Sequence, residues 1–82
     1  MAKDALPLTR KEKSRLQELG IRIRSVREQQ KLTLEGVEGR GYPSWKHLQA
    51  VESGRKNLTI TSLFRLAEAL GVSPENLIHR LK

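Results

Sequence analysis

Residues 32–54 read LTLEGVEGRGYPSWKHLQAVESG, and their pattern predicts two short helices joined by a tight turn. The first helix follows Thr33, a good N-terminal cap, and the second follows Ser44. Leu48 and Val51 lie three residues apart on the second helix, so we expect them to form the face that packs against the rest of the chain. The other side of this helix is then free, and it carries Trp45, Lys46, Gln49 and Ala50.

A short helix with its apolar side fixed and a polar, aromatic and basic side free fits the major groove of DNA. Gln49 can form a bidentate pair with adenine, and Lys46 can donate to guanine or to a phosphate, unless it is only a solvated surface lysine. Trp45 can contact a thymine methyl group or a sugar edge, unless its indole packs across the turn onto Tyr42 or Pro43. Each good contact to a base edge contributes about 1–3 kcal/mol of discrimination.

Before this stretch, the sequence predicts one long helix. TRKE at residues 9–12 has the form of a capping box, so the helix begins at about Thr9 and fades near residue 30 or 31. Gly20 weakens it by roughly 1 kcal/mol relative to alanine, a cost that the close approach of another helix would explain. We expect residues 1–8 to form a flexible N-terminal arm. The inward stripe of the helix, at spacings of three and four, is Leu16, Leu19, Ile23 and Val26.

After this stretch, the sequence predicts two more helices. Gly54 is the left-handed stop of the preceding helix, and Thr59 caps a fourth helix that ends at Gly71. Ser73 followed by Pro74 opens a fifth helix. The apolar face of the fourth helix is Ile60, Leu63, Leu66, Ala67 and Leu70, and that of the fifth is Leu77, Ile78 and Leu81. The three residues of the fifth helix either seal the core or form an isologous dimer patch.

Five helices and no strand candidate predict a single all-α bundle over residues 9–82. Eighty-two residues suffice for a modest core but not for an enzyme cleft with a second lobe. The net charge is +7, and residues 1–31 contribute +5 of it, from nine basic and four acidic residues. This charge favours a polyanionic partner through counterion release, although many small soluble proteins are basic. The chain has no cysteine, no signal-peptide core and no apolar run near 18 residues, so we expect a soluble, cytoplasmic protein without disulfides.

The chain from about Ile21 to Leu81 is similar to the Cro/repressor-type, or XRE, helix-turn-helix domain of bacteria and phages. Three motifs carry the resemblance together: IRSVRE at 23–28, HLQAVESGRKN at 47–57 and SLFRLAEALGVS at 62–73. The block VESGRKNLTITSL at 51–63 also resembles controller proteins of restriction–modification systems, a subgroup of this family. The resemblance implies a lambda-repressor-like bundle of five helices that binds an inverted repeat in DNA as a homodimer and regulates transcription.

The resemblance also implies roles for individual residues. Arg27 and Glu52 match a pair that forms a buried salt bridge between the first and third helices. The base-facing positions are Trp45, Lys46, Gln49 and Ala50, and the DNA backbone contacts are Ser44, Arg55, Lys56 and Asn57. His47 either reaches a phosphate when the helix docks or is half-buried against the second helix. The dimer interface that members of this family use corresponds here to Leu77, Ile78 and Leu81.

Four positions in the turn region depart from the family pattern. Leu34 stands where the family usually has a glutamine that helps to hold a phosphate. Glu38 stands in place of an alanine, Gly41 in place of an apolar core residue, and Tyr42 in place of a glycine. We therefore expect a shifted turn in which Tyr42 fills the gap that Gly41 leaves.

Two other classes of function compete with operator binding. One is a protein-interaction module, an antitoxin or adaptor, whose first helix and C-terminal tail bind a protein partner while DNA binding is weak. The other is a nonspecific nucleic-acid binder, which would show salt-dependent binding with little sequence preference. Separately, the first helix carries four basic residues that form either only its solvated side or an arm along DNA: Arg10, Lys11, Lys13 and Arg15. We expect no enzyme, because no catalytic set is visible. We also expect no cofactor and no metal, because His47 and His79 are isolated histidines without an acidic cluster.

Overall fold

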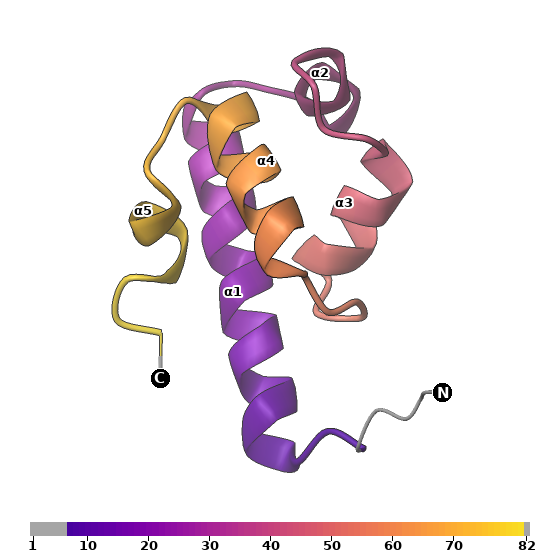
Figure 1. The fold of residues 1–82 in the computed structure, drawn as a ribbon, viewed down its shortest axis with the longest axis vertical. Coiled ribbons are helices and arrows are strands. Elements are labelled where there is room, and N and C mark those ends of the chain that lie inside the picture. Colours follow the sequence, from indigo (N-terminus) through magenta and orange to yellow (C-terminus); the bar gives the residue numbers. More distant parts are fainter. Residues whose placement is uncertain (1–6, 82) are drawn as a thin grey trace.

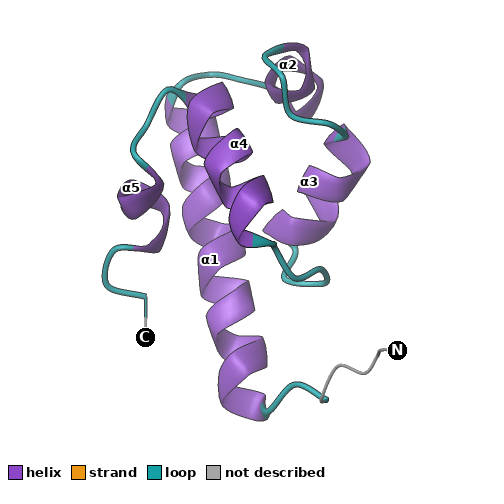
Figure 2. Ribbon diagram, in the orientation of Figure 1, coloured by secondary structure: helices purple, strands orange, loops and turns teal. Residues whose placement is uncertain are grey.

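The computed structural model describes residues 7–81, and over this range the chain is helical with no strand (Figure 2). Five helices follow one another along the chain: α1 (Arg10–Gln29), α2 (Leu34–Gly39), α3 (Trp45–Glu52), α4 (Ile60–Leu70) and α5 (Pro74–Ile78). The prediction of an all-α, five-helix bundle is confirmed. Residues 1–6 of the predicted N-terminal arm lie outside the described residues, and residues 7–9 lead into α1 without regular structure.

All five helices begin at the caps that the sequence indicates. The side-chain oxygens of the five cap residues accept hydrogen bonds from backbone amides in the first turn, so these otherwise unpaired donors are satisfied. In α1 the capping box is complete, since Glu12 also accepts from the amide of Thr9 at 2.8 Å. The five caps are Thr9, Thr33, Ser44, Thr59 and Ser73.

Figure 1 shows α1 as the long axis of the molecule, with α4 alongside its second half and α3 and α5 on opposite sides. The first turns of α1 project beyond the other four helices. Helix α3 packs against both α1 and α2, and α5 packs against both α1 and α4. The core between the helices consists of Ile23, Val37, Tyr42, Leu48, Val51, Leu63, Leu66, Ala67, Ala69, Leu70 and Leu77.

Gly20 explains how α3 comes so close to α1. A Cβ atom placed on Gly20 would lie 2.6 Å from the carbonyl oxygen of Val51 and 2.7 Å from the carbonyl carbon of Glu52. Both are backbone atoms at the C-terminal end of α3, and no side chain can fit between them and α1. Glycine lowers the helix propensity of α1 at this position, but it allows the backbones of α1 and α3 to be in direct contact.

Two expectations for the C-terminal half need correction. Ile60 is 65% exposed instead of lying on the apolar face of α4, because it occupies the first turn of that helix, at its edge. Helix α5 ends at Ile78, so Leu81 follows the helix instead of belonging to it, and the chain turns at Arg80, whose φ is 59°. Arg22 of α1 holds this end in place by donating to the carbonyl oxygens of Asn76 (3.1 Å) and His79 (2.7 Å).

Candidate nucleic-acid interface

Helix α3 lies with its apolar face against the bundle and its polar face outward. Leu48 and Val51 are 0% and 1% exposed, whereas Lys46 and Gln49, which are also three residues apart, have exposed side chains. The expectation that Ala50 lies on the free side is wrong, since it is only 9% exposed. Because α3 packs against two helices, more than one stripe of its surface is buried. The free polar face of α3 is therefore centred on Lys46 and Gln49.

Trp45 is the first residue of α3 and is half-buried. The Nζ atom of Lys46 lies over its indole, 5.8 Å from the ring centroid, which is within the range of a cation–π interaction. The two side chains thus place an aromatic surface beside a positive charge at the N-terminal end of the helix. This combination suits the sugar edge and phosphate of a nucleotide, one apolar and one anionic.

The start of α3 is held by two acceptors. The Ser44 hydroxyl accepts from the amide of His47 at 3.2 Å, and the Glu38 carboxylate accepts from the amide of Trp45 at 3.2 Å. The carboxylate is favourable there because the N-terminal end of a helix carries a partial positive charge. A phosphate that approaches this end from solvent meets the Glu38 carboxylate as well as helix amides.

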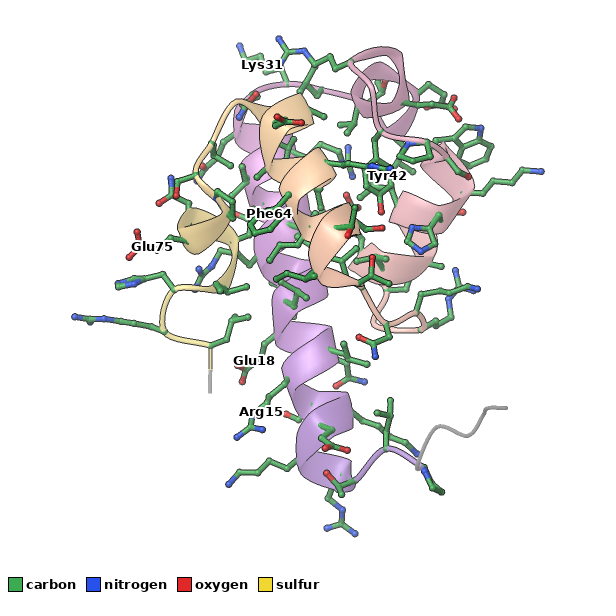
Figure 3. The ribbon with its side chains drawn as sticks, in the orientation of Figure 1. Arg15, Glu18, Lys31, Tyr42, Phe64 and Glu75 are labelled. Atoms are coloured by element: carbon green, nitrogen blue, oxygen red, sulfur yellow. The ribbon has the colours of Figure 1, made fainter. Side chains whose placement is uncertain are left out.

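Tyr42, labelled in Figure 3, lies in the turn between α2 and α3 and forms a pair with His47 of α3. Tyr42 is 2% exposed, and its hydroxyl lies 2.7 Å from Nδ1 of the half-buried His47, with the two rings stacked at a centroid distance of 5.9 Å. Burial raises the pKa of the Tyr42 phenol above its usual value of 10.0. Gly41 is exposed with a φ of 118°, a conformation that favours glycine. The expectation that the Tyr42 side chain fills a core position is therefore confirmed.

The predicted salt bridge between α1 and α3 is present. Arg27 donates through Nε to one carboxylate oxygen of Glu52 at 2.7 Å and through a terminal nitrogen to the other at 2.9 Å. Its remaining terminal nitrogen donates to the carbonyl oxygen of Leu32 at 2.8 Å. The hydrogen bond to Glu52 raises the pKa of Arg27. Because the two side chains are only 11% and 7% exposed, this bidentate pair fixes the register between α1 and α3.

The loop after α3 presents three exposed polar residues, Arg55, Lys56 and Asn57. Gly54 starts this loop with a φ of 77°, and the amide of Arg55 donates to the carbonyl oxygen of Ala50 at 2.9 Å. The side chain of Asn57 accepts from the amide of Leu58 at 2.8 Å, so one of its polar atoms is used within the loop. Arg55 and Lys56 keep their charged ends in solvent on the side of the bundle where α3 ends.

A family model described as helix-turn-helix matches residues 23–77, which span α2, α3 and α4, the last seven residues of α1 and all of α5 except Ile78. The chain belongs to the helix-turn-helix family of the XRE type. The helix-turn-helix domain is 40% identical over 60 residues to an uncharacterised HTH-type transcriptional regulator, y4dJ, from Sinorhizobium fredii (strain NBRC 101917 / NGR234). That match covers 73% of this chain and 78% of the relative.

A solved structure with the same fold is the restriction-modification controller protein C.AhdI from Aeromonas hydrophila. It superimposes with a TM-score of 0.73 over 76% of this chain and 94% of that chain, at 27% sequence identity. Both parts of the resemblance noted in the sequence, to the XRE family and to controller proteins, are thus confirmed.

The C-terminal residues of the helix-turn-helix domain divide between core and surface. Of the two roles left open for Leu77, core or dimer interface, the structure shows the core: Leu77 is 0% exposed, on a helix that packs against both α1 and α4. Ile78 is 47% exposed, and Leu81 is partly buried. Of the predicted dimer patch, only the last two have surface available to a second molecule.

Sequence reasoning missed the role of Glu38 and the Tyr42–His47 hydrogen bond. Both join residues that do not share a helix, so the periodicity of a single helix could not reveal either contact. Leu34, which replaces the usual glutamine, is partly buried against the core and contributes to packing. Over residues 7–81 no three acidic or histidine side chains come together as a metal site would require, and no described helix could cross a membrane.

Proposed function

We propose that this protein is a sequence-specific DNA-binding transcription regulator whose α3 enters the major groove. The observation that carries the proposal is the two-sidedness of α3: Leu48 and Val51 are fully buried, while Lys46 and Gln49 point into solvent. A helix fixed on one side by a core and by the Arg27–Glu52 pair presents its polar side in a defined orientation. Reading base edges requires such orientation, because each bidentate contact depends on geometry.

Lys46 and Gln49 are the proposed base-reading residues. Gln49 pairs with adenine through its amide, and Lys46 donates to guanine or to a neighbouring phosphate. Trp45 packs against a sugar edge or a thymine methyl group at the start of the helix. Ala50, being buried, has no part in this set.

Phosphate contacts are proposed at both ends of α3. Arg55, Lys56 and the remaining amide donors of Asn57 lie in the exposed loop after the helix, and Ser44 lies at its start. His47 can contribute through Nε2, since Nδ1 is within hydrogen-bonding distance of Tyr42. Such contacts fix the orientation of the protein on the duplex without reading sequence. The net charge of +7 supports them.

The proposal includes a homodimer on an inverted repeat, in the bacterial cytoplasm. One short recognition helix seldom gives the affinity of an operator complex, and a two-fold dimer doubles the contacts at half-sites about one helical turn apart. Ile78, which is 47% exposed on α5, and Leu81 after it are the residues proposed for the isologous contact.

Selection of binding sites from random duplex DNA at about 0.15 M salt tests this function, because nonspecific binding is weak there. We expect an inverted repeat with half-sites about 10 base pairs apart. Lys46→Ala with Gln49→Ala should abolish binding to the selected site, whereas Lys11→Ala with Gln29→Ala, which removes the same groups from exposed positions on α1, should not. Enrichment of no sequence contradicts the proposal.

The rival function is a protein-interaction module, and exposed apolar residues on α4 are the observation that favours it. Ile60 and Phe64 are 65% and 52% exposed and lie four residues apart on one face. If a protein partner were the main ligand, Phe64→Ser would abolish its capture, while the variant lacking Lys46 and Gln49 side chains would retain it. The opposite pattern supports the DNA-binding function.

A further inference from the structure

The first turns of α1 lie outside the part of the chain that matches the helix-turn-helix family. The family model begins at residue 23, whereas α1 begins at Arg10. In Figure 1 these turns continue past the rest of the bundle, next to the loop that follows α3. They bury little in the core: the first residue of α1 to be fully buried is Gly20.

One face of this extension is turned toward α3 and its loop. A Cβ atom on Gly54 would lie 2.8 Å from Cγ of Gln17, so the start of the loop rests directly on that side chain. Three residues further along α1, Gly20 touches the last turn of α3. Arg10 and Lys13 precede Gln17 by seven and four residues, and these spacings place them on the same face of the helix.

The charges of α1 are divided between its faces. Arg10 and Lys13 are exposed on the face that continues the surface of α3 and its loop. Glu18, labelled in Figure 3, points to the opposite side of the helix, away from α3, and Lys11 shares that side by its spacing of seven from Glu18. Arg15 lies between the two faces, since it lines a shallow hollow together with Glu12, Leu16 and Asn57 of the loop. The carboxylate of Glu12 is turned back to the amide of Thr9. The face toward α3 is therefore basic.

The length of the extension sets where these charges fall. A helix rises about 1.5 Å per residue, so Arg10 lies about 10 Å beyond Gln17 and the loop that rests on it. This distance corresponds to about three base pairs of duplex DNA, at 3.4 Å per step. If α1 runs along the duplex when α3 is in the major groove and the loop is on the backbone, the basic face reaches the next phosphates outside the half-site.

We infer that Arg10 and Lys13 form a second phosphate-binding surface, which holds the DNA flanking each half-site through its backbone. The inference rests on the proposed function, because α3 must dock as described for this face to meet the flank. Its ligand is the sugar–phosphate backbone of duplex DNA, without regard to base sequence.

Salt titrations of binding test this surface. The probes are the selected inverted repeat ending at its half-sites, the same site extended by five base pairs on each side, and a mixed-sequence duplex of the extended length. Arg10→Ala with Lys13→Ala is compared with Lys11→Ala with Arg65→Ala, which removes the same charges at exposed positions on the other side of α1 and on α4. Thermal unfolding of both variants checks that the bundle is intact.

We expect wild-type protein to bind the extended duplex more tightly than the short one. The Arg10, Lys13 variant should lose that difference, bind the extended duplex about tenfold to thirtyfold more weakly at 0.15 M salt, and lose about 1.8 from the salt slope per bound chain, as for two phosphates. The Lys11, Arg65 variant should change the slope by much less. If both variants behave alike on every duplex, the inference is overturned.

The failure of the inference and the failure of the proposed function are distinguishable. A chain that selects a site and depends on Lys46 and Gln49, but not on Arg10 and Lys13, keeps the function and loses only the second surface. If no site is selected, the proposed function fails. In that case the mixed-sequence duplex still decides whether Arg10 and Lys13 bind phosphates, because backbone contacts do not require an operator.

Discussion

Replacing Gly20 with alanine tests the close contact between α1 and α3. The added methyl group would lie 2.6 Å from the Val51 carbonyl oxygen and 2.7 Å from the Glu52 carbonyl carbon, both backbone atoms that cannot rotate away. Overpacking of this kind costs typically 1–3 kcal/mol, and we take about 3 kcal/mol because backbone must move. Alanine recovers about 1 kcal/mol of helix propensity. The net loss should be about 2 kcal/mol.

The assay is thermal and urea-induced unfolding followed by circular dichroism. For a domain of this size, about 2 kcal/mol corresponds to a Tm lower by about 8–16 °C. Gly39→Ala is the matched control, since Gly39 is also in a helix but a Cβ atom there would meet nothing within 4 Å. We expect the control to keep or raise the stability, by up to about 1 kcal/mol.

The reasoning predicts opposite signs for the same chemical change at two glycines. If Gly20→Ala were as stable as the wild type, α1 and α3 would accommodate a methyl group at residue 20. The close contact would then not restrict residue 20 to glycine, and the reasoning would be refuted. A loss of the same size at Gly39 would show that the effect comes from something other than the contact with α3.

Three further outcomes are expected. Glu52→Gln should lower the free energy of unfolding by about 3 kcal/mol in urea titrations, because the Arg27 charge then stays shielded from water without its carboxylate partner. The control Glu28→Gln, which removes an exposed partner of Arg24, should lower it by under about 1 kcal/mol. The raised pKa of Tyr42 means that the folded chain holds the phenol proton more tightly than the unfolded chain, so stability is retained below pH 10.0 and falls as the pH rises above it. Phenolate absorbance reports this residue alone, as the chain has one tyrosine, and a native midpoint at or below that of the urea-unfolded chain would contradict the prediction. Ile78→Asp should convert a dimer to a monomer in sedimentation experiments without changing the fold. Leu77→Ala should instead lower the free energy of unfolding by about 2–5 kcal/mol. A monomeric wild type would remove the dimer from the proposal.

Much of the fold follows from local signals in the sequence. A cap such as Thr9 or Ser44 acts within three residues of itself, so its chemistry is visible without knowing the neighbours. Gly20 is also a local signal, because a residue that is unfavourable within a helix indicated the close contact with another helix. The Arg27–Glu52 pair spans 25 positions and came from the family resemblance, since nothing in its spacing shows it.

The errors concern side chains whose burial depends on two neighbouring elements at once. Ala50 is small enough for either environment, and only the packing of α3 between α1 and α2 decides that it is buried. Leu77 is likewise covered because α5 packs against both α1 and α4. Glu38 reaches the start of α3 only because α2 and α3 pack closely across the turn. Sequence periodicity describes one helix at a time and cannot show how one helix packs against another.

The buried and exposed residues of α3 have separate roles, and this separation affects how the sequence of such a domain can evolve. Leu48 and Val51 hold the helix in the core, and Glu52 ties it to α1, whereas Lys46 and Gln49 project into solvent from the same eight residues. If Lys46 and Gln49 read base edges as proposed, substitutions at these two positions should alter which duplex is preferred while leaving the folded state nearly as stable. A gene of this kind can therefore acquire a new target by one or two codon changes, without first passing through an unfolded intermediate.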